Sequence, residues 1–223
     1  MSRPIKLLIL IILSLSVYFI YQSTKETNIK ILTLADGLSL GINSFGIKEY
    51  SYVDYYKDYL EKTNKKVNLI KYSKEDLSIH EALKEIKNNN TLKRDLLESH
   101  ILIINLGYND LVYKMSLEED ITISELNKIV KEIDKEYKLL IKEIRKYYKK
   151  EIIVIGYPKS NKEDYYSNIG IRKLNKVLNT NTFIDTYSLL YNRNKYFSNP
   201  NSYYPNRNGY LKIAQELKQN WFI

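Results

Sequence analysis

The sequence predicts an α/β protein with a doubly wound parallel sheet. The two observations behind this are its short apolar runs and their alternation with stretches of helical spacing. Short apolar runs rich in Ile and Leu alternate with longer stretches whose apolar residues recur at helical spacing. Short runs of this kind are typical of parallel strands that connecting helices bury on both faces. The functional crevice of such a sheet lies beyond the carboxyl ends of its strands, so the residues that follow those ends are the candidates for a site.

The expected elements follow one another along the chain. Apolar runs predict a sheet of about five strands, at 29–34, 67–72, 101–106, 152–155 and 183–184. Helical spacing predicts helices at 50–63, 79–86, 123–149, 171–178 and 210–221. Because no internal repeat and no Pro/Gly/Ser-rich linker interrupts this alternation, residues 29–223 are predicted to form one domain.

The amino-terminal segment 1–21 is predicted to be a transmembrane signal anchor. Arg3 and Lys6 precede an apolar run from Leu7 to Tyr21 that only two serines interrupt. The run is near the short limit for a span, which takes ~17–25 residues. No small-residue cleavage pattern follows it, which favours an uncleaved anchor over a removed signal peptide. With the basic residues held inside, residues 22–28 become a polar connector and the domain lies outside the cytoplasm.

The composition argues against several classes of partner and cofactor. The formal charge is +9, but lysines are interspersed with acidic residues as on solvated helix faces, so no nucleic-acid partner is expected. The absence of cysteine excludes a thiol nucleophile, disulfides and cysteine metal sites. The two histidines, His80 and His100, stand apart and make no ligand cluster, so neither a metal nor a cofactor is expected.

Three segments that follow predicted strand ends carry the candidate site. Ala35-Asp36-Gly37-Leu38-Ser39-Leu40-Gly41 follows the first strand, Gly107-Tyr108-Asn109-Asp110 follows the third, and Tyr204-Pro205-Asn206-Arg207-Asn208-Gly209-Tyr210 opens the closing helix. Each alone has an ordinary turn composition, whereas their order and their places in the fold are specific. Together they resemble the SGNH/GDSL family of esterases, lipases and acylhydrolases, which has Gly-Asp-Ser-Leu, Gly-x-Asn-Asp and Asp-x-x-His-Pro-Asn at these places. The resemblance covers the whole predicted domain and implies a flavodoxin-like, three-layer α/β/α fold.

The resemblance implies that the nucleophile is missing. Asp36, Leu38 and Gly41 match the first motif on both sides of one position, where the family has its catalytic serine. That position is Gly37, and a glycine offers no side chain that could attack an acyl group.

The resemblance implies that the base and the acid are missing too. Pro205 and Asn206 match the last motif, which places Tyr204 at the histidine position and Asn201 at the aspartate position. A phenol with a pKa near ~10 is a poor base at neutral pH, and an asparagine cannot stabilise an imidazolium as a carboxylate does.

The matched residues that remain are Asp36, Gly107, Asn109 and Asn206, of which Gly107 and Asn109 correspond to the oxyanion-hole segment of the family. We therefore expect a pseudoenzyme whose pocket binds an acylated or glycan-like ligand, or a module that binds an envelope protein. An active esterase with relocated residues is the alternative. Its nucleophile would be Ser39, although this hydroxyl is also expected at the N-cap or in the first turn of a helix.

Two further groups are interpreted as structural. His100 is expected at the amino end of the third strand, away from the crevice, whereas His80 opens a helix and lies nearer to it. The acidic run Glu118-Glu119-Asp120 precedes the long helix, where negative charge favours the helix amino terminus.

Overall fold

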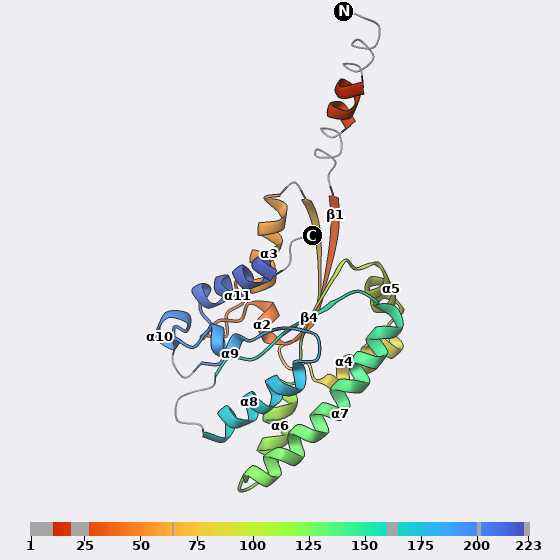
Figure 1. Ribbon diagram of the computed structural model, residues 1–223. Helices are drawn as coiled ribbons and strands as arrows, with labels where there is room; N and C mark the ends of the chain where they lie inside the picture. Colours follow the sequence, from red (N-terminus) through yellow and green to blue (C-terminus); the bar gives the residue numbers. More distant parts are fainter. Residues whose placement is uncertain (1–10, 19–26, 64, 160–164, 200–201, 221–223) are drawn as a thin grey trace, which may run out of the picture.

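A computed structural model describes residues 11–18, 27–63, 65–159, 165–199 and 202–220 (Figure 1). In this part of the chain a five-stranded parallel sheet has the order β2-β1-β3-β4-β5, which is the flavodoxin-like order. The strands are β1 (Thr27–Ala35), β2 (Lys65–Ser73), β3 (Ile101–Asn105), β4 (Ile152–Ile155) and β5 (Thr182–Ile184). The predicted α/β class, parallel sheet and strand number are confirmed.

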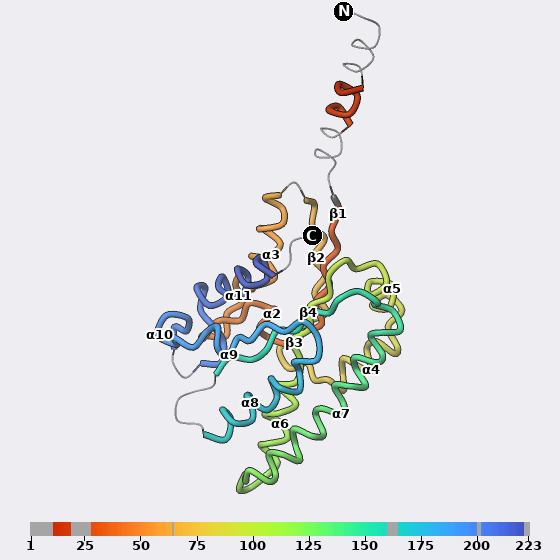
Figure 2. Tube along the Cα trace, in the orientation of Figure 1, coloured from red at the N-terminus to blue at the C-terminus, as the bar shows by residue number. Residues whose placement is uncertain are grey.

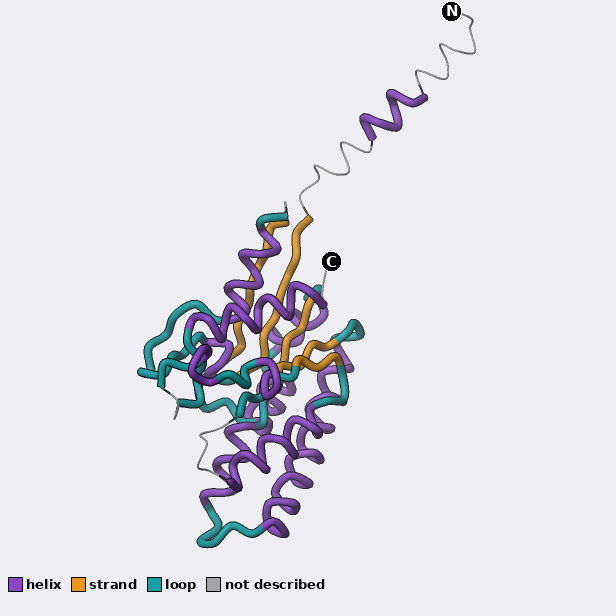
Figure 3. Tube along the Cα trace, turned by 60° about the vertical axis from the view of Figure 1, so that its left-hand side comes forward, coloured by secondary structure: helices purple, strands orange, loops and turns teal. Residues whose placement is uncertain are grey.

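Helices cover both faces of the sheet, as the tube in Figure 2 and the turned view in Figure 3 show. One face carries α3 (Tyr52–Glu61) and α11 (Arg207–Asn220), which pack against each other. The other face carries α4 (Ile79–Asn88), α5 (Asn90–Glu98), α6 (Tyr108–Ser116), α7 (Ile123–Tyr147) and α8 (Tyr165–Leu178). Three four-residue helices lie in the connections: α2 (Gly37–Leu40), α9 (Thr186–Leu189) and α10 (Arg193–Tyr196).

The sequence explains these elements locally. β3 and β4 are buried at every residue, because helices cover both of their faces. Helix α7 begins with a capping box of Thr122 and Glu125 and buries one apolar stripe that includes Leu126, Ile133 and Leu140. The acidic run at 118–120 precedes this helix, as expected. Two of the longer helices, α5 and α6, were not predicted, because charged residues dilute their short apolar stripes, and the four-residue helices α9 and α10 were not predicted either.

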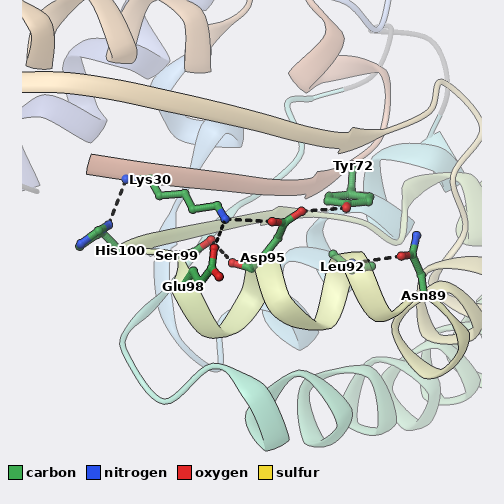
Figure 4. Close-up of polar contacts among 8 residues, drawn as sticks. All are labelled: Lys30, Tyr72, Asn89, Leu92, Asp95, Glu98, Ser99 and His100. Atoms are coloured by element: carbon green, nitrogen blue, oxygen red, sulfur yellow. Dashed lines mark hydrogen bonds and ion pairs between the residues drawn. The ribbon is translucent and has the colours of Figure 1, made fainter. Parts of the chain in front are cut away.

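A polar network fastens α5 to the sheet, and Figure 4 shows it. The Nζ atom of Lys30 donates to Asp95 at 2.9 Å and to Glu98 at 2.7 Å, and the Tyr72 hydroxyl donates to Asp95 at 2.9 Å. The backbone N–H of Lys30 donates to Nδ1 of His100 at 3.0 Å. His100 therefore lies at the amino end of β3 and has a structural partner there, as expected.

The described part of the amino-terminal segment is a short exposed helix over residues 11–18. Within the described ranges no helix is long and apolar enough to cross a membrane. The other residues of the predicted anchor, 1–10 and 19–21, lie outside those ranges, as does most of the connector. The strand β1 begins at Thr27, two residues before the predicted start of the domain.

Candidate functional site

The carboxyl ends of β1 and β3 are joined at Asp36. Its backbone N–H donates to the carbonyl of Asn105 at 3.0 Å, and its carboxylate caps α2 by accepting from the N–H of Leu38 at 3.2 Å. The second carboxylate oxygen accepts from the Tyr157 hydroxyl at 2.7 Å. Burial raises the pKa of Asp36 to about 7, although the hydrogen bond from Tyr157 acts in the opposite direction. Both oxygens of the Asp36 carboxylate therefore accept hydrogen bonds from within the protein and connect α2 to Tyr157.

Gly37 and Tyr204 are in direct contact across the crevice. A Cβ atom added to Gly37 would lie 2.4 Å from Oη and 2.9 Å from Cε1 of Tyr204, so the phenol ring fills the space that a side chain at 37 would need. The structure therefore brings together the two positions that the resemblance assigns to nucleophile and base. Burial, with the negative charges of Asp36 and Glu75, raises the pKa of Tyr204 above the range in which a phenol could act as a base.

Four tyrosine rings close this part of the crevice. Tyr108 stacks on Tyr203 with ring centroids 4.0 Å apart and on Tyr157 at 5.4 Å, and Tyr204 meets Tyr203 edge-on at 5.2 Å. The rings come from the segments after β3, after β4 and before α11. Sequence reasoning singled out Tyr204, as the residue at the base position, and missed the other three. Their positions could have indicated them. Tyr108 and Tyr157 follow strand ends, and Tyr203 directly precedes the segment that opens α11.

The matched oxyanion-hole residues shape the neighbouring loop. Gly107 has φ +120°, a conformation that favours glycine, where the chain passes from β3 into α6. The side-chain amide of Asn109 donates to the backbone carbonyls of Glu75 at 3.0 Å and Leu77 at 3.3 Å. Asn109 thus fastens the β2–α4 loop, and Glu75 of this loop in turn interacts with Tyr204. Asn109 is therefore linked to Tyr204 through Glu75, and Tyr204 contacts Gly37.

The side chains of Asn206 and Ser39 are both hydrogen-bonded within the protein. Oδ1 of Asn206 accepts from the N–H of Gly209 at 3.1 Å, and its Nδ2 donates to the carbonyl of Lys195 at 3.1 Å, so this amide is committed to the start of α11. The Ser39 side chain is fully buried in the first turn of α2, where it donates to Ser73 Oγ at 2.7 Å. The N-cap of α2 is Asp36. Asn201 lies outside the described residues.

An open cleft of about 680 Å³ lies beside the filled crevice, between α4, α6 and α7. Asn109 lines it, and so does the buried Asp110, which accepts from the N–H of Ile79 at 3.1 and 3.2 Å. Burial raises the pKa of Asp110 to about 6. The other lining residues are Asp76, Ser78, His80, Glu81, Val112, Tyr113, Lys114, Ser116 and Glu136.

Sequence reasoning gave no role to Asp110, although it belongs to the Gly-x-Asn-Asp segment. It placed His80 at a helix start near the crevice, and this residue begins α4 as an exposed side chain of the cleft. Among the described residues no group of three or more His, Asp or Glu side chains could hold a metal ion.

Comparison with known proteins identifies the fold. No protein-family model matches the chain, and no curated protein is similar to it in sequence. Solved structures are similar to it: a lipase, Lip_vut3, from a goat rumen metagenome has a TM-score of 0.72 at 21% identity, with 86% of this chain and 96% of the lipase covered. A catalytic mutant of Axe2, an acetylxylan esterase from Geobacillus stearothermophilus, has a TM-score of 0.64 at 15% identity, with 90% and 97% covered.

A lipase/acylhydrolase from Enterococcus faecalis has a TM-score of 0.62 at 17% identity, with 86% of this chain and 96% of the other covered. The chain therefore has the SGNH/GDSL hydrolase fold over nearly the full length of these enzymes. At such identities the likeness concerns the fold, and the chemistry has to be argued from the residues of this chain.

Proposed function

We propose that this chain is a membrane-anchored, extracytoplasmic binding protein with an SGNH hydrolase fold and no hydrolytic activity. The contact between Gly37 and Tyr204 carries the proposal. The nucleophile position has no side chain, the Tyr204 ring occupies the space that one would need, and this residue at the base position keeps its proton at neutral pH. Acyl transfer by the route of this family needs both groups.

The alternative of an esterase that uses Ser39 has less support. The Ser39 hydroxyl is fully buried, and its hydrogen bonds run to the Asp36 carbonyl and to Ser73. A nucleophile needs a base within hydrogen-bond reach and access to substrate. His100 lies at the amino end of the sheet, and His80 is an exposed residue of the neighbouring cleft.

The open cleft supports a hydroxylated ligand such as a glycan. Its lining combines carboxylates, a histidine, serines and an amide, which can accept from and donate to sugar hydroxyls. The Tyr113 side chain is 64% exposed at this cleft, so its ring is free to stack on an apolar sugar face. Val112 is the aliphatic side chain of this described lining, and the other apolar atoms belong to Tyr113 and to the stems of polar side chains, so the cleft has no continuous aliphatic wall for a long acyl chain. The likeness to an acetylxylan esterase fits a carbohydrate ligand.

Calorimetric titration of the full chain in detergent with acetylated and unacetylated xylo-oligosaccharides and N-acetylglucosamine oligomers tests the proposal. We expect saturable binding to at least one of these glycans without release of acetate. Tyr113→Ala should weaken this binding about five- to tenfold through lost stacking. The matched control is Tyr191→Ala, which removes a tyrosine that is 72% exposed outside the cleft.

Three results would count against this function. Absence of saturable binding to every glycan refutes the glycan ligand, and equal losses in the two tyrosine variants refute the cleft as the site. Catalytic release of acetate by the natural chain refutes the loss of hydrolytic activity. A specific envelope protein recovered on the chain, with no glycan bound, would instead favour a partner module.

A further inference from the structure

Basic side chains gather at the amino ends of the strands. The register pairs Thr27 with Lys65 and Asn28 with Lys66, which places two lysines beside the start of β1. On the other side of β1, Lys150 precedes β4 and its Nζ donates to the carbonyl of Ser99 at 2.8 Å. We call this surface the amino-end face and define it by Lys65, Lys66, His100, Arg145, Lys149 and Lys150.

The amino-end face is continuous across the sheet. Lys66 and His100, together with Lys30, line one shallow cleft of about 480 Å³ at the start of β1. Arg145 extends the face toward β5, because its guanidinium donates to Oδ1 of Asn181 at 3.0 Å. Basic side chains therefore lie beside the starts of the five strands that the structure describes.

Few carboxylates offset this charge. Lys30 does not add to the surplus, because it pairs with Asp95 and Glu98, and these two carboxylates leave the group with one net negative charge (Figure 4). Lys65, Lys66, Lys149 and Lys150 form no ion pair with another described residue. Glu98 and Glu151 are acidic residues beside the face, and the Glu151 carboxylate accepts from the Thr182 hydroxyl. Burial and the charges of Lys150 and Lys30 lower the pKa of His100, in keeping with a positive local field.

The open cleft at the other end of the sheet has the opposite character. The open cleft is lined by four carboxylates, those of Asp76, Glu81, Asp110 and Glu136, and by a single lysine, Lys114, among the described residues. The basic amino-end face and this acidic cleft therefore lie at opposite ends of the sheet. β1 has nine residues, and at ~3.3 Å per residue the two ends are about 30 Å apart.

The chain enters the domain at this basic end. β1 begins at Thr27, and Figures 1 and 3 show the 11–18 helix beyond the amino end of β1, away from α6. We propose that the amino-end face lies against the anionic phospholipid headgroups of the bilayer that holds the amino-terminal segment. This inference rests on the proposed membrane anchor. It orients the domain with the open cleft about 30 Å away from the bilayer, toward ligands of the surrounding envelope.

Amine labelling of the full chain in lipid nanodiscs tests the orientation. Two kinds of disc are compared, phosphatidylcholine alone and phosphatidylcholine mixed with phosphatidylglycerol, and acetylation of each lysine is followed by mass spectrometry. We expect slower labelling of Lys65, Lys66, Lys149 and Lys150 in the anionic discs, with the protection lost at high salt. The internal controls are Lys128 and Lys131, exposed lysines of α7 beyond this face, which should label equally in both discs.

Charge variants sharpen the test. Each lysine near an anionic surface is worth about fivefold in the equilibrium between docked and released domain. Lys65→Gln/Lys66→Gln should therefore weaken the protection of Lys149 and Lys150 by about 25-fold at most. Lys128→Gln/Lys131→Gln makes the same change of net charge and should leave that protection intact.

The outcomes separate this inference from the proposed function. A chain that inserts into both discs and labels equally at the amino-end face refutes the docking surface and leaves the anchor standing. A chain that fails to insert into either disc overturns both. Protection that persists at high salt, or in phosphatidylcholine alone, contradicts recognition of anionic headgroups.

Discussion

A methyl group at position 37 probes the contact on which the account depends. Gly37 does not have a positive φ, so alanine can adopt its backbone conformation. The added Cβ would lie 2.4 Å from Oη of Tyr204, whereas unstrained carbon contacts lie near ~3.5–4.0 Å. Overpacking of this kind costs about 1–3 kcal/mol, and a shift of the Tyr204 ring can relieve part of this cost. We expect Gly37→Ala to destabilise the fold by about 1–2 kcal/mol.

A double-mutant cycle with Tyr204→Ala isolates the cause. Without the ring, Gly37→Ala meets no obstacle and should be neutral or slightly stabilising, which gives a coupling energy of about 1–3 kcal/mol. The free energies of unfolding are measured by urea denaturation of the four full-length variants, followed by circular dichroism. Equal costs of Gly37→Ala in the two backgrounds would refute the packing of Tyr204 into the nucleophile position.

Three further predictions concern polar groups. Because the pKa of Asp36 is raised to about 7, the folded chain keeps a proton that the unfolded chain releases, and stability falls as pH rises from about 4 to 7. Asp36→Asn should remove part of this fall in urea titrations across the range, and an unchanged pH profile would contradict the shift. Burial would raise the pKa of Asp95, but the hydrogen bonds from Lys30 and Tyr72 lower it. Asp95→Asn should therefore cost about 1–3 kcal/mol at neutral pH and progressively less below about pH 4, and a constant cost would count against the ion pair. Asn109→Ala should leave the Glu75 and Leu77 carbonyls without their side-chain donor, at a cost of about 1 kcal/mol, and should speed hydrogen exchange across residues 74–78.

Much of the fold could be predicted from the sequence because its signals are local. Apolar runs marked the strands, and the long amphipathic stretch marked α7. The first motif placed Gly37 and the last placed Tyr204, and the contact between them agrees with that alignment. Two residues far apart in sequence could be paired because each lies at a fixed place relative to a strand end or a helix start.

The remainder depends on tertiary contacts that a pattern does not encode. Nothing in the segment after β4 predicts that the Tyr157 hydroxyl donates to Asp36, and nothing predicts that Tyr108 stacks on Tyr203. The sequence could therefore predict that the catalytic side chains are missing. It could not predict that tyrosine rings fill the space beside Gly37. The role of Asn206 was also hidden, since the same amide that matches the motif is occupied in capping α11.

Labelling with a fluorophosphonate probe tests whether the natural chain has a reactive nucleophile. The natural full-length chain and the variant Gly37→Ser/Asn201→Asp/Tyr204→His are each incubated with the probe, and intact mass reports the adduct. We predict no adduct on the natural chain, because position 37 lacks a hydroxyl and Ser39 is buried. The triple variant removes the phenol ring that blocks position 37 and supplies all three groups, so labelling there would show that the crevice is otherwise intact. Stoichiometric labelling of the natural chain, at Ser39 or at any other residue, would contradict the account.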